Sequence, residues 1–234
     1  MCGRYSLHTP PEEILEHFEL SVLPQWEPRY NVAPTQDVPV VRQEDGDRAL
    51  STVRWGLIPF GAEALPSGPP LINARSETVD TRPSFRWAFR RNRCLVAADG
   101  FYEWKKVGAQ RYPYFLAKTD GGLFAFAGVW DRWAPREGDP VETCAILTTE
   151  PNAVAKQLHD RMPVILDPAA YQRWLDPEAD LAALRDLLVP FDANQMTAYP
   201  VGRAVNKVEN DGPECIERAE APRAPIELDL FDDV

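Results

Sequence analysis

Proline most constrains what this chain can form, because 23 prolines are spread through its 234 residues. Proline lacks a backbone N–H and fixes its own φ, so it interrupts the interior of helices and strands. A bundle of long helices is therefore not expected, whereas many short elements joined by ordered loops are. The hydrophobic content of 44% is that of a globular protein, and the length suits one large domain or two small ones.

Short β-like runs rich in valine, isoleucine and aromatic residues follow one another from Arg29 to Thr148. The stretch Asp120–Gly122 lies between two of these runs and predicts a hairpin turn. The predicted strands are Val38–Arg42, Leu50–Trp55, Arg93–Ala98, Phe101–Lys105, Tyr112–Lys118, Leu123–Trp130, Cys144–Thr148 and, near the C-terminus, Thr197–Val201.

Helical patterns lie on either side of this region. Thr9, followed by two prolines and two glutamates, predicts a helix that is capped by Thr9 and ends near Leu20. Further helices are predicted over Asn152–His159, Pro168–Leu175 and Glu178–Leu188, the last from its stripe of leucines.

Charge is distributed unevenly along the chain. Glu209–Val234 contains nine acidic and two basic residues, whereas Arg75–Lys118 contains ten basic and four acidic ones. We expect one α+β domain over residues 1–217, with a mostly antiparallel, barrel-like β-sheet flanked by short helices, and an acidic, flexible tail over residues 218–234. Because the C-terminal end supplies most of the net charge of −11, that total does not exclude nucleic acid as a partner of the domain.

Membrane association, metals and cofactors are not indicated. No run approaches the roughly 18 apolar residues of a membrane span, and the first residues lack a signal-peptide pattern, so we expect a cytoplasmic protein. The four cysteines stand far apart without a CxxC pair, and with only three histidines neither a zinc site nor a disulfide framework is expected. The cysteines are Cys2, Cys94, Cys144 and Cys215.

Cys2 is a candidate nucleophile, because removal of Met1 would leave it with an amine and a thiol on adjacent carbons. A terminal amine titrates near neutrality, and a thiol needs only a modest shift to become a thiolate. Such a pair captures aldehydes, since the amine forms a Schiff base and the thiol then closes a thiazolidine ring. Taken alone, Cys2 is better explained as a buried, inert cysteine near a frayed terminus.

Two further residues could move protons. Strand alternation places Phe101 and Glu103 on one face, with Tyr102 and Trp104 on the other. Glu103 is then either surface decoration or an acid whose pKa is raised by an apolar wall. His159, at the end of a predicted helix, is either a C-terminal cap or a general acid/base for Cys2.

Asn73–Thr78 combines an amide, an arginine and hydroxyl side chains in a predicted loop. The hydroxyls could simply cap a helix. Arg75, together with Arg4 and Arg161, could instead hold phosphates through bidentate hydrogen bonds. A tryptophan beside these cations, such as Trp104, is either part of the core or a surface on which a base stacks.

These signals are weak singly, but they belong to a series of spaced motifs. The motifs are Met1–Tyr5, Arg29–Gln36, Trp55–Pro59, Ile72–Thr78, Arg93–Leu95 with Gly100–Trp104, His159–Pro163 and Val201–Asn206. Their combination and order resemble the SRAP family, the SOS-response-associated peptidases or abasic-site processing proteins. The resemblance runs from Cys2 to about Glu217 and covers nearly the whole chain.

The resemblance implies a sensor of abasic sites in single-stranded DNA, which shields the lesion by forming a stable thiazolidine cross-link with the opened sugar. Cys2 would be the nucleophile, Asn73 would position its amine and the sugar, and Glu103 would move a proton at the sugar oxygen. His159 would assist proton transfer at the same centre. The family is also credited with autoproteolytic removal of a short leader, here Met1, and with lyase activity on abasic strands. No cofactor or metal is implied, and we expect a monomer.

The same resemblance implies a set of DNA contacts. The expected contact residues are Arg4, Asn31, Pro34, Arg75, Trp104 and Arg161. The arginines would hold the phosphates flanking the lesion, and the tryptophan would lie against a base. One departure follows Trp55–Pro59, where the family usually has a further tryptophan but this chain has Phe60–Glu63 and no tryptophan before Trp87. Phe60 or Leu65 would have to take over any base-wedging role of that stretch.

Two other functions fit part of the pattern. N-terminal-nucleophile glutamine amidotransferases also begin Met-Cys-Gly, but they lack blocks like Asn73–Arg75 and His159–Arg161, and no synthetase domain is recognisable here. In a non-covalent single-stranded-DNA-binding scaffold Cys2 would be incidental, and Cys2→Ala would leave DNA binding unchanged.

The tail carries a separate hypothesis. Glu227–Phe231 resembles the short peptide with which bacterial replication proteins bind the sliding clamp, with glutamate where glutamine is usual. Leu228, Leu230 and Phe231 would fill an apolar pocket as the segment orders on contact. A solvated acidic tail is the alternative.

Overall fold

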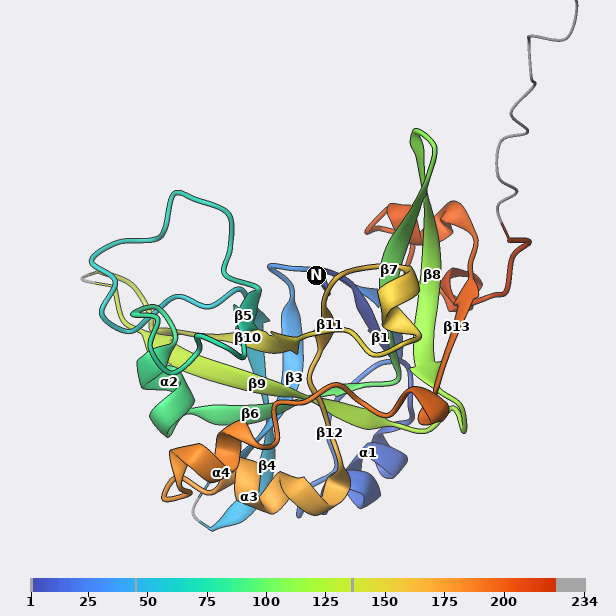
Figure 1. Ribbon diagram of the computed structural model, residues 1–234. Coiled ribbons are helices and arrows are strands. Elements are labelled where there is room, and N and C mark those ends of the chain that lie inside the picture. Colours follow the sequence, from blue (N-terminus) through green and yellow to red (C-terminus); the bar gives the residue numbers. More distant parts are fainter. Residues whose placement is uncertain (1, 45, 136, 222–234) are drawn as a thin grey trace, which may run out of the picture.

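A closed ring of five strands forms the centre of the computed structural model, which describes residues 2–44, 46–135 and 137–221 (Figure 1). The ring runs through β10, β4, β3, β6 and β9, and returns to β10 through the β9–β10 pairing. All its pairings are antiparallel except that between β4 and β10. The ring strands are β3 (Asp37–Glu44), β4 (Asp47–Trp55), β6 (Arg93–Ala98), β9 (Phe124–Trp133) and β10 (Val141–Thr149). This arrangement confirms the predicted α+β fold with a mostly antiparallel, barrel-like sheet.

A second sheet of five strands packs beside the barrel, in the order β13–β8–β7–β1–β2 (Figure 1). Its strands are β1 (Tyr5–Leu7), β2 (Arg29–Val32), β7 (Gly100–Val107), β8 (Gln110–Lys118) and β13 (Met196–Pro200). The Tyr5 ring of β1 joins the two sheets, because it lies 5.4 Å from the Trp55 ring and 5.9 Å from the Phe126 ring of the barrel.

Short elements complete the fold. Three small strands extend the barrel sheet: β5 (Asn73–Arg75), β11 (Met162–Pro163) and β12 (Ile165–Leu166). The α-helices are α1 (Pro11–Phe18), α2 (Arg86–Arg91), α3 (Tyr171–Leu175) and α4 (Leu181–Arg185), and the 3-10 helices are η1 (Ala155–Gln157), η2 (Pro168–Ala170), η3 (Ala193–Gln195), η4 (Arg203–Asn206) and η5 (Pro213–Cys215). Figure 1 places α1, α3 and α4 along the lower side of the molecule.

Successive side chains of β7 alternate between two hydrophobic clusters. Phe101 belongs to the main core, whereas Tyr102 and the half-buried Trp104 belong to a smaller cluster under η4 and η5. The predicted alternation is therefore correct, and it turns Glu103 to the same side as Phe101. Glu103 is only 4% exposed, which excludes its interpretation as surface decoration.

Several predicted elements differ from the structure at their ends. Asn152–His159 forms only the short η1, because the Asn152 side chain accepts hydrogen bonds from the N–H groups of Val154 and Ala155 and favours a turn. Glu178–Leu188 contracts to α4, which Asp180 caps. Thr9 does not cap α1, since its hydroxyl donates to the Asp99 carboxylate instead.

The structure also differs from the predicted hairpin turn and from the predicted loop at Asn73. Asp120–Gly122 leads from β8 to β9, which lie in different sheets and do not pair, so it is a turn without a hairpin. The hairpin is formed by β7 and β8 and turns at Gly108, whose φ is 60°. Asn73–Arg75 is not a loop, because it pairs with β10 as the parallel strand β5.

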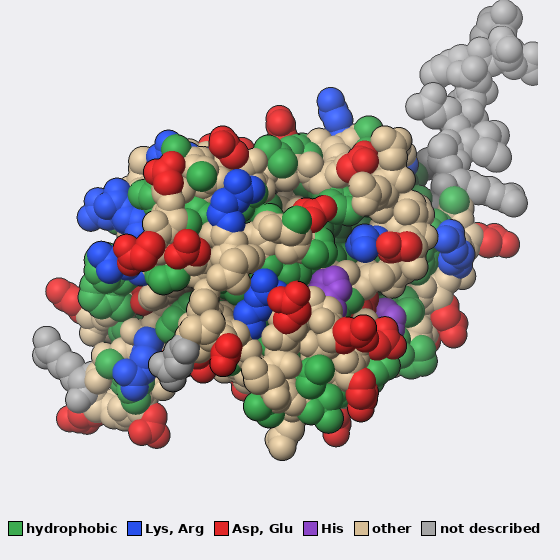
Figure 2. All heavy atoms as spheres, turned by 90° about the horizontal axis from the view of Figure 1, so that it is seen from below, with side chains coloured by type: hydrophobic (Ala, Val, Ile, Leu, Met, Phe, Trp, Pro, Cys, Tyr) green, Lys and Arg blue, Asp and Glu red, His purple; other side chains and the backbone are tan. Residues whose placement is uncertain are grey.

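The packed chain continues slightly past residue 217. Val201 and Arg218 form a β-bridge, and the Arg218 guanidinium lies 4.0 Å from the centre of the Tyr199 ring. The predicted clamp-binding peptide Glu227–Phe231 lies outside the described residues. None of the described helices has the length and apolar character needed to cross a membrane. On the lower face, acidic and basic side chains are interspersed (Figure 2).

Candidate active site

Cys2 reaches the centre of the molecule through the pairing of β1 with β7. Tyr5 lies opposite Phe101, and the Tyr102 N–H donates to the Arg4 carbonyl over 3.0 Å. Continued toward the N-terminus, the same antiparallel register places Glu103 opposite Gly3, the residue next to Cys2, and the Glu103 carboxylate acts on the pKa of the Cys2 thiol. Cys2 is fully buried, and its Sγ donates to the Arg4 carbonyl over 3.9 Å.

Asn73 holds Cys2 from the other sheet. Its Nδ2 donates to the Cys2 carbonyl over 2.8 Å. The Asn73 backbone is fixed because β5 pairs with β10, with Asn73 beside Ile146. The Asn73 Oδ1 is buried and has no hydrogen-bond partner among the described residues. It is therefore an open acceptor directed into the protein beside Cys2.

Burial controls the ionisation of Cys2 and Glu103. Burial, and then the Glu103 carboxylate, raise the pKa of the Cys2 thiol well above its ordinary value. Burial also raises the pKa of Glu103, while the His159 imidazole acts in the opposite direction. The thiol is therefore neutral in this state, and the carboxyl holds its proton to a higher pH than an exposed glutamate does.

His159 lies at the rim of the same cluster, just before β11, and its side chain is 32% exposed. Its Nδ1 accepts the Arg161 N–H over 3.0 Å and also lies 2.8 Å from the Asp160 carboxylate. An unprotonated Nδ1 accepts from Arg161, whereas a protonated one donates to Asp160. The ring therefore has a defined partner in each protonation state.

Arg4 and Trp104 form one predicted DNA-contact group. The Arg4 guanidinium donates to the Asn31 Oδ1 and to the Val205 carbonyl, both over 2.7 Å, and lies 5.9 Å from the centre of the Trp104 ring. Asn31 is fully buried, and its Nδ2 donates to backbone carbonyls, including that of Asn210 over 2.6 Å. Asn31 thus lies behind Arg4 and fixes its position, whereas Pro34 is half-buried in the loop after β2.

Arg75 and Arg161 differ in their surroundings. Arg75 is exposed in β5, opposite Thr148. Arg161 is largely buried and forms a two-pronged ion pair with Glu77, in which Nη2 and Oε2 are 2.9 Å apart. Its Nη2 also donates to the Thr148 carbonyl over 2.5 Å. A phosphate would therefore have to compete with Glu77 for Arg161.

A cavity of about 520 Å³ opens next to Asn73. It is lined by Asn73, Arg75, Thr78, Thr81 and Arg82. The last three were not predicted as site residues. The positions of Thr78 and Arg82 carry a usable signal, because their spacings of three and seven residues from Arg75 favour the same side of a helical turn.

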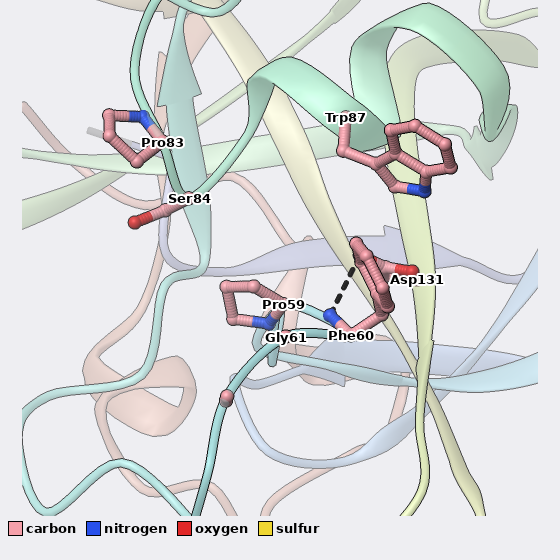
Figure 3. Close-up of a pocket in the computed structure, with 8 residues that line it drawn as sticks. Pro59, Phe60, Gly61, Pro83, Ser84, Trp87 and Asp131 are labelled. Atoms are coloured by element: carbon pink, nitrogen blue, oxygen red, sulfur yellow. Dashed lines mark hydrogen bonds between the residues drawn. The ribbon is translucent and has the colours of Figure 1, made fainter.

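A smaller hollow of about 290 Å³ is lined by Phe60, one of the two residues predicted to take over the role of the missing tryptophan (Figure 3). The Phe60 and Trp87 rings both face it, with their centres 5.4 Å apart, and Pro83 and Ser84 lie on its other side. The Phe60 N–H donates to Asp131 over 3.0 Å. Phe60 is 56% exposed and Trp87 47% exposed, so both rings are accessible. Leu65 lines a different hollow.

Fold and site together define a class of protein: a mixed α+β barrel with a buried cysteine at position 2, flanked by an amide, an acid and arginines. No group of three or more metal-ligating side chains occurs in the part of the chain that the structure describes. The family of SOS response associated peptidases (SRAP) matches residues 1–208, and the chain belongs to this family.

Individual relatives agree with this assignment. The chain is 42% identical to the abasic site processing protein YoqW of Bacillus subtilis, covering 93% of this chain and 99% of that one. It is 34% identical to the abasic site processing protein YedK of Escherichia coli, covering 93% and 99%. A crystal structure of a protein from Bacteroides thetaiotaomicron superposes with a TM-score of 0.84 at 27% identity, covering 94% of this chain and 100% of that one.

Proposed function

We propose that this protein processes abasic sites in single-stranded DNA by capturing the opened sugar on Cys2 after Met1 has been removed. Two relatives carry the name abasic site processing protein. The observation that carries the proposal most directly is the 2.8 Å hydrogen bond from Asn73 Nδ2 to the Cys2 carbonyl, beside the buried carboxyl of Glu103. Capture of an aldehyde uses the amine and the thiol of Cys2, which Asn73 holds in place, and Glu103 is an acid close enough to supply a proton.

The proposed chemistry has two steps. The Cys2 amine attacks the aldehyde carbon of the ring-opened deoxyribose, and one water leaves as the Schiff base forms. The thiol then adds to the imine carbon, its proton passes to the nitrogen, and a thiazolidine ring closes. Overall, one C–N and one C–S bond form and one water is lost.

Each candidate residue has a role in these steps. Glu103, whose pKa is raised by burial, gives a proton to the sugar oxygen during ring opening and takes one back later. The open Oδ1 of Asn73 accepts a hydrogen bond from the new amine of Cys2. His159 exchanges protons with solvent at the rim, since its side chain is 32% exposed.

The DNA backbone is held by the cations around this centre in the same proposal. Arg4, Arg75 and Arg161 bind the flanking phosphates, and a base lies against Trp104. The Schiff base also permits β-elimination of the 3′ phosphate, which would account for lyase activity. Removal of Met1 by the protein itself is the proposed peptidase activity.

A denaturing gel tests the capture. A single-stranded oligonucleotide with one uracil, treated with uracil glycosylase, should give a slow-migrating adduct with the wild-type protein. The same oligonucleotide without uracil should give none, and neither should Cys2→Ala. An adduct of equal yield with Cys2→Ala, or binding of both oligonucleotides without any adduct, would show that the protein is not a Cys2-dependent capture protein.

A further inference from the structure

The turn that follows Asn73 is firmly anchored in the core. Val79 and Phe85 are buried, at 0% and 1% exposure. Between them the Arg82 N–H donates to the Thr78 carbonyl over 2.9 Å, and the Thr78 N–H donates to the Arg75 carbonyl over 3.1 Å. These bonds carry Arg75, Thr78 and Arg82 onto one side of the turn, where they line the cavity beside Asn73.

The acidic and the basic side chains of this turn line two different cavities. Glu77 pairs with Arg161, and Asp80 pairs with Arg185, around a separate cavity of about 380 Å³. The cavity beside Asn73 has two arginines and no carboxylate among its described lining residues. Neither Arg75 nor Arg82 forms an ion pair within the described part of the chain. Two arginines without an ion-pair partner among the described residues therefore line the cavity together with two threonines, of which Thr81 donates its hydroxyl to the Thr78 carbonyl over 3.2 Å.

We propose that this cavity is a phosphate subsite for the lesion-bearing strand, in which Arg82 and the hydroxyls of Thr78 and Thr81 hold a phosphate beyond the one bound by Arg75. The inference rests on the proposed function, because Asn73 both lines the cavity and holds Cys2. Arginine suits this role because its planar fork matches two phosphate oxygens, and exposed threonine hydroxyls add donors to phosphate.

The hollow between Phe60 and Trp87 favours a nucleotide strand over a free anion as the ligand of this cavity. Arg82 lines the phosphate cavity, and Pro83, the next residue, lines the hollow between Phe60 and Trp87. Figure 3 shows these two rings facing the hollow together. A strand that leaves its phosphate at Arg82 meets an aromatic surface for its base directly afterwards. A free phosphate would use only the cationic half of this surface.

Salt-dependent binding of an undamaged single-stranded oligonucleotide tests the subsite. Arg82→Gln should lower the slope of log K against log salt by about 0.7 and weaken binding about fivefold at about 0.1 M salt, as the loss of one phosphate contact does. Arg86→Gln is the matched control, because Arg86 is also exposed but lies in α2 outside this cavity. It should keep the wild-type slope.

The outcomes separate this inference from the proposed function. Arg82→Gln should slow adduct formation at subsaturating protein, where DNA binding limits the rate, whereas Arg86→Gln should form adduct as the wild type does. Equal slopes for Arg82→Gln and Arg86→Gln would overturn the subsite. The subsite would also be overturned if wild-type protein bound inorganic phosphate at constant ionic strength, and Arg82→Gln lost this binding while it kept the wild-type affinity for the oligonucleotide, because the cavity would then hold the free anion and not the strand. A wild-type protein without adduct, but with the Arg82 effect intact, would contradict the proposed function alone.

Discussion

Glu103 shows at the scale of one residue how burial of an acid affects stability, and burial also favours the neutral form that the proposed proton transfer requires. Burial raises its pKa in the folded protein, so the folded state favours the neutral carboxyl. The free energy of unfolding is therefore highest below the ordinary glutamate pKa, where Glu103 is neutral in both states. This stability is lost as the pH rises through the raised pKa of the folded protein. Between the ordinary and the raised pKa the folded protein therefore favours the neutral carboxyl, whereas the unfolded chain favours the carboxylate.

Glu103→Gln should remove this pH dependence. At pH 7 we expect its Tm to exceed that of the wild type by about 2–4 °C, the shift that about 1 kcal/mol makes in a protein of this size. The difference should disappear below about pH 3, where the wild-type carboxyl is neutral in both states. Because glutamine cannot transfer a proton, adduct formation should slow by about 10²-fold. A Tm difference independent of pH, or an unchanged rate, would contradict the role given to Glu103.

Glu77 is expected to restrain DNA binding. In the DNA-free protein its carboxylate forms an ion pair with the guanidinium of Arg161. This contact lowers the Glu77 pKa, so the carboxylate stays charged. Glu77→Gln should therefore tighten binding of undamaged single-stranded DNA about fivefold at about 0.1 M salt, the gain of one phosphate contact. Asp80→Asn makes the same charge change at the neighbouring Arg185 pair and should have a smaller effect. Equal gains in DNA affinity for the two variants would indicate that net charge alone is responsible. Weaker DNA binding by Glu77→Gln would mean that Glu77 positions Arg161.

Among the elements, β7 depends on close packing at its first residue. A Cβ added to Gly100 would lie 2.8 Å from the Leu116 carbonyl and collide with the Phe115 ring. Gly100→Ala should therefore separate β7 from β8, destabilise the protein by about 1–3 kcal/mol and displace Glu103 from Cys2. Gly202→Ala is the control, because nothing lies within 4 Å of its added Cβ. Thermal unfolding measures the difference, and equal Tm values for the two variants would contradict this packing.

The longer elements could be predicted from sequence, and the shortest could not. Val38–Arg42 and Arg93–Ala98 lie in barrel strands, because buried strands consist of β-branched and apolar runs. Asn73–Arg75 has three residues, too few to show alternation, and only its pairing with β10 makes it a strand. The same holds for the site. Motifs identified Asn73 and Glu103 as candidates, but their convergence on Cys2 depends on pairings between distant strands that no local pattern contains.

For the whole molecule, the distribution of charge matters more than its total of −11. Acidic and basic groups are interspersed on the lower face (Figure 2). The cavity beside Asn73, in contrast, is lined by two arginines without a carboxylate among the described residues. A local cationic surface with nearby aromatic rings is sufficient for single-stranded DNA. The net acidic charge is therefore compatible with the DNA binding that we propose.

The C-terminal tail contains a predicted binding peptide for a protein partner. Residues Glu227–Phe231 are predicted to bind a bacterial sliding clamp through Leu228, Leu230 and Phe231. Purified clamp should be retained by the immobilised full-length protein and lost on Leu230→Ala/Phe231→Ala, whereas adduct formation should be unchanged. Equal retention of the clamp by the double variant would discard the interaction.

Intact mass of the protein–DNA adduct tests the central claim most directly. For the wild type we predict the mass of the chain without Met1, plus the abasic oligonucleotide, minus one water, and an adduct that survives heating. Cys2→Ser should give no durable species, because an oxygen analogue of the ring reverses readily. An adduct that retains Met1, or one equally durable with serine at position 2, would contradict capture by the N-terminal cysteine.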